Sequence, residues 1–109
     1  MQVNILPEVL EYFEELAVIL YEKGYFSFEE PALTYVTELY DDIIANLPTK
    51  LHKPAPVYFN KYGKNMKYAV FKKNKHTSWY AFFKTYQKNG EIVYVVRYIA
   101  NNHVIAQYL

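Results

Sequence analysis

The sequence has 109 residues, no cysteine and a hydrophobic fraction of 52%, which predicts a single domain spanning residues 1–109 around one core. The lack of cysteine excludes a disulfide framework and a thiolate metal site. No apolar run approaches the roughly 18 residues of a membrane span, and carboxylates stand where a signal peptide needs basic residues. We therefore expect a cytoplasmic protein with no membrane contact.

Charge is divided between the two halves of the chain. Residues 1–50 hold ten carboxylates and two lysines, whereas residues 51–109 hold one carboxylate, nine lysines and one arginine. The overall charge of +1 therefore conceals an acidic half and a strongly basic half. A positive field on a tyrosine-rich half would attract nucleic acid or an acidic protein segment, although both charge sets could equally be solvated faces.

The acidic half predicts a short strand and a helical hairpin. Alternation over Gln2–Leu6 favours a brief strand, and Pro7 is suited to the first turn of a helix that ends at Gly24. A capping box at Ser27–Glu30 predicts the start of a second helix, which Pro48 ends. A short loop makes the two helices antiparallel. Their apolar faces are expected to be Leu10, Phe13, Leu16, Ala17 and Leu20, then Leu33, Val36, Leu39, Tyr40, Ile43 and Leu47.

The basic half predicts an antiparallel meander. Two prolines, at positions 54 and 56, favour an extended crossing with a small strand around Val57–Phe59. Three strands follow it, at Met66–Lys73, Thr77–Lys88 and Glu91–Ala100. The predicted fold is therefore α+β, with a short N-terminal strand and an antiparallel helical hairpin packed on one face of a three- to four-stranded antiparallel sheet.

Asn89-Gly90 is the strongest turn signal, because a type I′ hairpin needs two residues that tolerate positive φ. If Lys88 faces Glu91, the register groups Trp79, Ala81, Phe83 and Thr85 with Tyr94, Val96, Tyr98 and Ala100 on one face. We expect Trp79, Phe83, Ile92 and Val96 to pack against the helices. The opposite, open side would then carry Lys84 and Arg97, flanked by Tyr80 and Tyr86.

This order of elements, followed by a terminal His-x4-Tyr, resembles the RelE/ParE superfamily of bacterial type II toxins. The run from Thr77 to Leu109 is similar to the family's two central strands and its C-terminal motif, in which His103 and Tyr108 would be the motif's histidine and tyrosine. The family's nucleases usually place a basic residue after this histidine, whereas Val104 and Ile105 follow here, and Tyr80 occupies the expected place of an arginine.

The resemblance implies a toxin component that is neutralised by a cognate antitoxin protein. It leaves two mechanisms open, because family members include ribosome-dependent mRNA endoribonucleases and ParE-like inhibitors of DNA gyrase that are not nucleases. An inactive member that only binds a protein partner is a third possibility. We expect an acidic, amphipathic antitoxin segment to cover part of the basic surface, including apolar groups such as Val93 and Val95.

Metal-free RNA cleavage needs a base, an acid and cations near the phosphate. His103, Tyr108 and Arg97 are the catalytic candidates, although a lone histidine after a strand is also a common surface residue. His52 and His76 are expected to be solvent-exposed. No phosphate loop, metal cluster or nucleophile elbow is present, so we expect neither metal nor cofactor. The candidate nucleic-acid-binding residues are Lys84, Lys72, Lys73, Lys75, Tyr80 and Tyr86, the tyrosines serving either as stacking platforms or as core.

Overall fold

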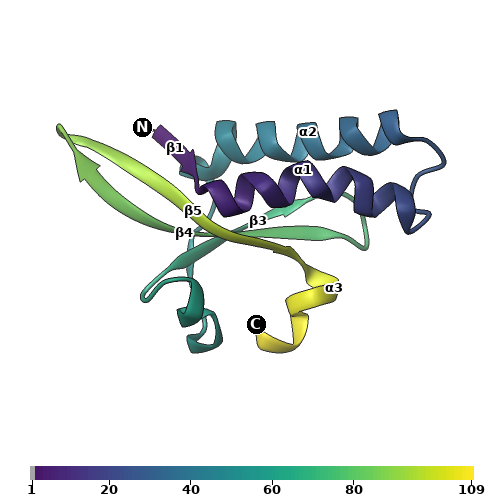
Figure 1. The fold of residues 1–109 in the computed structure, drawn as a ribbon. Helices are drawn as coiled ribbons and strands as arrows, with labels where there is room; N and C mark the ends of the chain where they lie inside the picture. Colours follow the sequence, from purple (N-terminus) through teal and green to yellow (C-terminus); the bar gives the residue numbers. More distant parts are fainter. Residues whose placement is uncertain (1) are drawn as a thin grey trace.

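The computed structural model describes residues 2–109 and shows an α+β domain with two long helices on one side of a twisted sheet and a thinner layer on the other (Figure 1). The elements are β1 (Gln2–Ile5), α1 (Pro7–Glu22), α2 (Glu29–Asn46), η1 (Leu47–Thr49), β2 (Lys53–Pro54), η2 (Val57–Tyr62), β3 (Lys67–Lys72), β4 (Ser78–Lys88), β5 (Glu91–Asn101), α3 (Asn102–Ile105) and η3 (Ala106–Tyr108).

The sheet has five strands in the order β1-β5-β4-β3-β2, and β1 runs parallel to β5. The prediction of a purely antiparallel sheet of three to four strands is therefore wrong. The first strand pairs with the last one, and the backbone N–H of Leu6 extends this pairing by donating to the carbonyl of Val96 at 3.1 Å. At the opposite edge Lys53 and Pro54 pair with β3, where proline is tolerated because an edge strand has no further neighbour.

The two helices form where the sequence predicts them. Pro7 lies in the first turn of α1, and Gly24 has a φ of +80°, which supplies the left-handed residue after the helix. The predicted capping box of α2 is absent, because the helix begins at Glu29 and Phe28 occupies the N-cap position without a side-chain hydrogen bond. Ser27 therefore lies one residue too early to cap the helix.

The main core lies between the helices and the sheet. Trp79, Phe83 and Val96 are buried in it together with residues of both helices, as predicted. The apolar stripes are rotated by one residue at two places, where Val9 and Ala32 are buried and Leu10 and Leu33 are exposed. The buried members are Val9, Phe13, Leu16, Val36, Leu39, Ile43, Leu47, Ala69, Phe71, Trp79, Ala81, Phe83, Tyr94, Val96 and Ile99.

The register predicted for the β4–β5 hairpin is correct only for the half nearest the turn. Asn89 and Gly90 have φ values of +52° and +80°, and the pairs from Lys88↔Glu91 to Phe83↔Val96 are those predicted. The next pair is Phe82↔Tyr98, so Arg97 is an extra residue at a β-bulge. Tyr98 and Ala100 consequently belong to the face away from the helices, and Ile99 replaces them in the main core.

Two exposure predictions for β5 are also wrong. Ile92 lies in the hairpin arm, which projects beyond the helices in Figure 1, and its side chain is exposed rather than packed in the main core. Val93 is buried and Val95 is half-buried, although both were expected to be exposed. The apolar surface predicted there for a partner is therefore smaller than expected.

A second core covers the face of the sheet that the sequence predicted to be open. Val57–Tyr62 forms a 3-10 helix rather than a strand, because Pro56 fixes the entry and its carbonyl accepts a hydrogen bond from the N–H of Phe59 at 3.0 Å. This element, α3 and η3 pack against the sheet from below (Figure 1). The buried members are Phe59, Met66, Phe82, Ala100 and Ile105.

Candidate functional site

His103 and Tyr108 lie in the C-terminal segment and face different neighbours. The His103 side chain is exposed, and its Nε2 lies 3.5 Å from the hydroxyl of Thr77 in the turn before β4. The Tyr108 ring stacks on the ring of Tyr58 in η2, with centroids 3.6 Å apart and an interplanar angle of 7°. His103 is thus held near one end of β4, whereas Tyr108 is held against η2 in the layer below the sheet.

Arg97 is the third catalytic candidate and sits at the β-bulge. One of its Nη atoms donates a hydrogen bond of 2.7 Å to the hydroxyl of Tyr86. Its Nε is buried and has no hydrogen-bond partner among residues 2–109. The arginine stem passes close to Gly63, where a Cβ would lie only 3.0 Å from Arg97 Cδ.

The structure does not bring these three candidates together into one catalytic group. Within residues 2–109, the side-chain hydrogen bonds and ring contacts of the three candidates share no partner. His103 contacts Thr77, Arg97 contacts Tyr86, and Tyr108 contacts Tyr58 and Phe59. A general acid and base must each reach the reacting atoms within hydrogen-bond distance or through one water. The arrangement therefore offers separate surfaces for recognition rather than an assembled acid–base pair.

The lysine run after β3 lies against α2. Lys73 Nζ is 3.8 Å from a carboxylate oxygen of Glu38 and 4.9 Å from the ring centroid of Tyr35. Lys72 and Lys75 are exposed nearby. Because Lys73 already contacts an acidic and an aromatic side chain, this run is partly a contact between the two halves of the chain.

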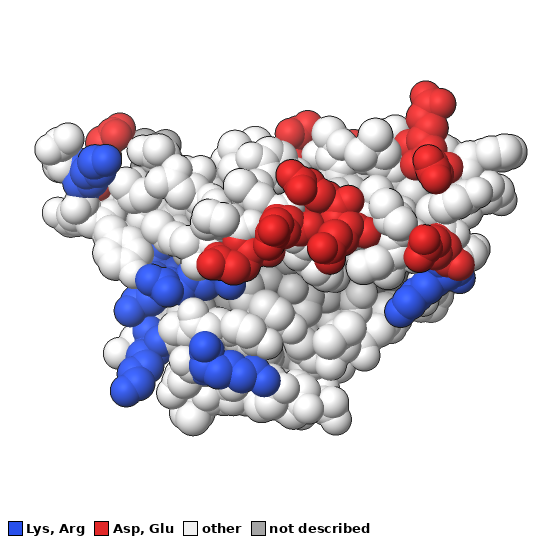
Figure 2. All heavy atoms as spheres, in the orientation of Figure 1, with Lys and Arg blue, Asp and Glu red and all other residues white. Residues whose placement is uncertain are grey.

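The remaining nucleic-acid candidates divide between two environments. Lys84 and Tyr86 lie two residues apart on the face of β4 away from the helices. The hydroxyl of Tyr86 accepts a hydrogen bond from Arg97 on the neighbouring strand. Tyr80 does not lie on an open side, because it packs against the second core beside Tyr68, with ring centroids 5.7 Å apart. Figure 2 shows basic side chains below the acidic row of α1, with most of them toward the left of the view.

His52 is not the exposed loop residue that the sequence predicted. Its side chain is half-buried, and its Nε2 lies 2.8 Å from the carbonyl oxygen of Leu47. The ring makes edge contacts with Phe83 and Tyr94, with centroids 4.7 and 5.8 Å apart. His52 therefore completes the main core at the start of the crossing, whereas His76 is exposed as predicted.

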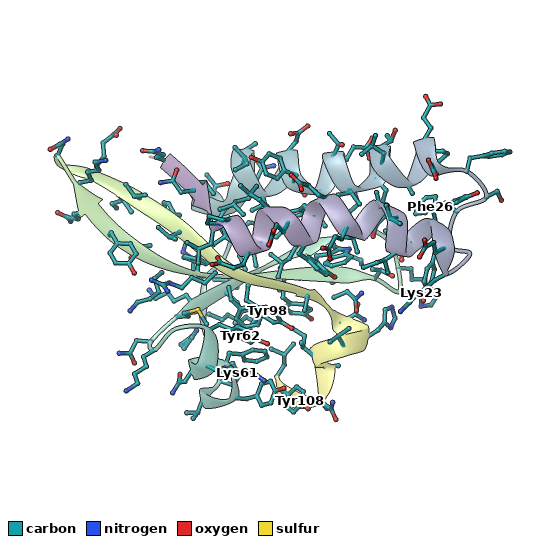
Figure 3. All side chains as sticks on the ribbon, in the orientation of Figure 1. Lys23, Phe26, Lys61, Tyr62, Tyr98 and Tyr108 are labelled. Carbon is teal, nitrogen blue, oxygen red and sulfur yellow. The ribbon has the colours of Figure 1, made fainter. Side chains whose placement is uncertain are left out.

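A groove that the sequence did not predict lies beside α1 on the side of the second core. Its volume is about 690 Å³. Tyr62 and Tyr98 form one wall as a parallel stack with centroids 3.9 Å apart, and Figure 3 shows both below the sheet, away from the helices. The lining residues are Leu6, Glu8, Val9, Tyr12, Tyr62, Arg97, Tyr98, Ile99, Ala100 and Val104.

Two of the tyrosines in the groove have a raised pKa. Burial raises the pKa of Tyr12, and burial together with the hydroxyl of Tyr62 raises the pKa of Tyr98. Both phenols therefore stay protonated, as hydrogen-bond donors, to a higher pH than an ordinary tyrosine. The groove thus combines apolar walls with phenol donors and one guanidinium group.

A second tyrosine cluster lies on the outer surface of η2. Lys61 Nζ is 3.1 Å from the hydroxyl of Tyr58 and lies 4.2 Å from the centre of that ring. This hydrogen bond is the largest cause that lowers the pKa of Tyr58, while hydrogen bonding to Tyr58 raises the pKa of Tyr108. A cation beside two stacked rings can contact an anion or a further aromatic group.

A signal for both features is present in the sequence. Tyr62 follows Phe59 by three residues and Tyr58 by four, which is the spacing of a helical turn. The run from Trp79 to Phe83 is apolar or aromatic at every position, which indicates a strand covered on both faces. Either pattern predicts a layer beneath the sheet.

Comparison with known proteins adds no relative: no protein-family model, curated protein or solved structure matches this chain. Of the helices in residues 2–109, none is long and apolar enough to cross a membrane.

Proposed function

We propose that this protein is the toxin component of a type II toxin–antitoxin module and that it acts by binding a macromolecular target. The observation that carries the proposal is the order of elements along the whole chain. A strand, a helical hairpin, a proline-containing crossing and three antiparallel strands precede the segment that holds His103 and Tyr108. This is the layout on which the resemblance to RelE/ParE toxins rests.

Binding is favoured over RNA cleavage by the positions of the catalytic candidates. His103 contacts Thr77, Arg97 contacts Tyr86, and Tyr108 stacks on Tyr58. An inhibitor that occupies a target such as DNA gyrase needs a surface but no acid–base pair. A cognate antitoxin would neutralise such an inhibitor by covering that surface.

One observation favours the endoribonuclease as a second candidate. Lys84, Tyr86 and Arg97 lie on one face of the hairpin, and an RNA backbone could contact their basic groups while a base stacks on the ring. This version of the proposal places mRNA on the ribosome as the target. It requires His103 to reach that RNA from the other end of β4.

Growth arrest on induced expression tests the toxin proposal, and histidine variants separate the two mechanisms. We expect the wild-type chain to stop growth of a bacterial host and co-expression of the adjacent reading frame's product to restore it. His103→Ala should keep full toxicity, as should the control His76→Ala, since His76 is also exposed. Purified protein should then inhibit gyrase supercoiling and leave ribosome-bound message intact.

Other outcomes would redirect or reject the proposal. Loss of toxicity and of message cleavage in a folded His103→Ala variant would establish the nuclease instead, because removing a proton-transfer group costs roughly 100- to 10,000-fold in rate. A wild-type chain that never arrests growth would leave only a protein-binding domain. That result would reject the toxin function itself.

A further inference from the structure

The groove beside α1 has the size and lining of a binding site. Its volume of about 690 Å³ falls in the range of roughly 300–1,000 Å³ that ligand pockets occupy. Five aliphatic side chains and three tyrosines make up most of the wall, and Glu8 and Arg97 are its charged members among the described residues. Such a groove can take a few apolar side chains at once.

The guanidinium of Arg97 has capacity for an anionic partner. Within the described chain, its side-chain hydrogen bond goes to the hydroxyl of Tyr86, and no ion pair joins it to a carboxylate. Its Nε is buried and has no acceptor among residues 2–109, so a partner's carboxylate would reach the guanidinium through the Nη atoms. An arginine has five donor hydrogens, and a carboxylate is the acceptor that best matches their geometry.

Both rims of the groove are open, which favours a chain segment over an enclosed small molecule. Glu8 is exposed at one rim, and Val104 is 57% exposed at the other. A bound segment could therefore turn a polar side to solvent while its apolar side chains enter the groove. This is the way an amphipathic helix binds a hydrophobic groove.

Charge limits where an acidic residue of that segment can lie. The C-terminal half carries nine lysines and one arginine, so it would attract an acidic partner from solution. Figure 2 shows a row of carboxylates along α1 directly above the hollow, and these would repel acidic residues on that side. The favourable place for a carboxylate is therefore at Arg97.

We propose that this groove is the docking site for an amphipathic segment of a partner protein, which inserts apolar side chains between Tyr12 and Val104 and places one carboxylate on Arg97. The inference goes beyond the proposed function, because it concerns a partner surface and holds whichever target the protein inhibits. The segment needs a narrow apolar face and an acidic residue at one end of that face.

The test uses two synthetic amphipathic peptides that differ at one position. Each has leucines along one face, with either glutamate or glutamine beside them. We expect the glutamate peptide to bind the full chain about tenfold more tightly, the size of effect that one charge-assisted hydrogen bond gives. Amide chemical-shift changes should map to residues around Tyr12, Tyr98 and Val104.

Matched variants separate groove binding from general charge attraction. Val104→Glu should weaken both peptides at least about tenfold, because it puts a charge at the apolar rim. Val57→Glu is the control, since Val57 is 79% exposed and does not line the groove. Arg97→Gln should bind the two peptides equally, and Arg97→Lys should retain the preference for glutamate if the glutamine variant does not fold.

Three results would overturn the proposal. Equal binding of the two peptides to the wild-type chain would remove the role of Arg97. Equal damage from Val104→Glu and Val57→Glu would show non-specific attraction. Tighter binding of N-acetylphenylalanine than of the glutamate peptide would make the groove a small-molecule site.

Discussion

Replacing Trp79 with alanine tests the packing of the main core most directly. Trp79 is only 2% exposed, and its indole Nε1–H donates a hydrogen bond of 2.9 Å to the hydroxyl of Tyr35 on α2. Removing a buried aromatic ring leaves a cavity and typically costs about 3–5 kcal/mol. A domain of this length has a total stability of roughly 5–15 kcal/mol, so the variant should lose at least about a fifth of it.

The hydrogen bond to Tyr35 can be separated from the packing of the ring. Tyr35→Phe keeps the ring but leaves the buried indole N–H without its acceptor, which costs about 1–3 kcal/mol. Trp79→Phe removes the donor and part of the ring. A double-mutant cycle should then show a coupling energy of at least about 0.5 kcal/mol between the two side chains.

Urea unfolding followed by circular dichroism measures these values in all variants. Trp79 is the only tryptophan, so the wild-type fluorescence should also shift to longer wavelength on unfolding. A cost below about 1 kcal/mol for Trp79→Ala at an unchanged m-value would refute the placement of this ring. An emission maximum that stays constant on unfolding would refute it independently.

Two further predictions concern the groove region. Gly63 has a φ of +152°, and an added Cβ would press on Arg97. Gly63→Ala should therefore destabilise the fold by about 1–2 kcal/mol in urea titrations. Gly24→Ala should cost less, because a Cβ there meets open space. Because folding raises the pKa of the Tyr98 phenol, its contribution to stability is present below pH 10 and is lost as the pH rises above that value. Above pH 10, the free energy of unfolding should therefore fall less steeply with pH for Tyr98→Phe than for the wild type.

Local sequence signals were sufficient for the elements that local interactions determine. Pro7, Gly24 and Pro48 limit the helices as predicted, and Asn89-Gly90 sets the hairpin turn, because each acts through its own backbone preference. The exact face that a helix buries was less predictable. Val9 and Ala32 are buried in place of Leu10 and Leu33, since the packing of both helices on a twisted sheet decides the rotation.

The pairing of β1 with β5 could not be predicted from residue patterns. These strands lie about ninety residues apart in the sequence, and a four-residue strand carries too little alternation to identify its neighbour. The lower layer was missed for a different reason. Lys84 and Arg97 indicated a solvent-facing side, although Phe82 on the same face of the sheet is buried beneath the ring of Phe59.

The bulge at Arg97 is one reason why part of the second core and the groove were missed together. Alternation continued past Val96 would turn Tyr98 and Ala100 toward the helices, as the sequence analysis assumed. One extra residue moves the side chains of Tyr98 and Ala100 to the other face of the sheet. Tyr98 then stacks on Tyr62, and Ala100 joins Phe59 and Ile105 in the second core. The same residue supplies the guanidinium at the groove. A single unpaired position in β5 thus adds Tyr98 and Ala100 to the second apolar face and supplies the charge that would select a partner for the groove.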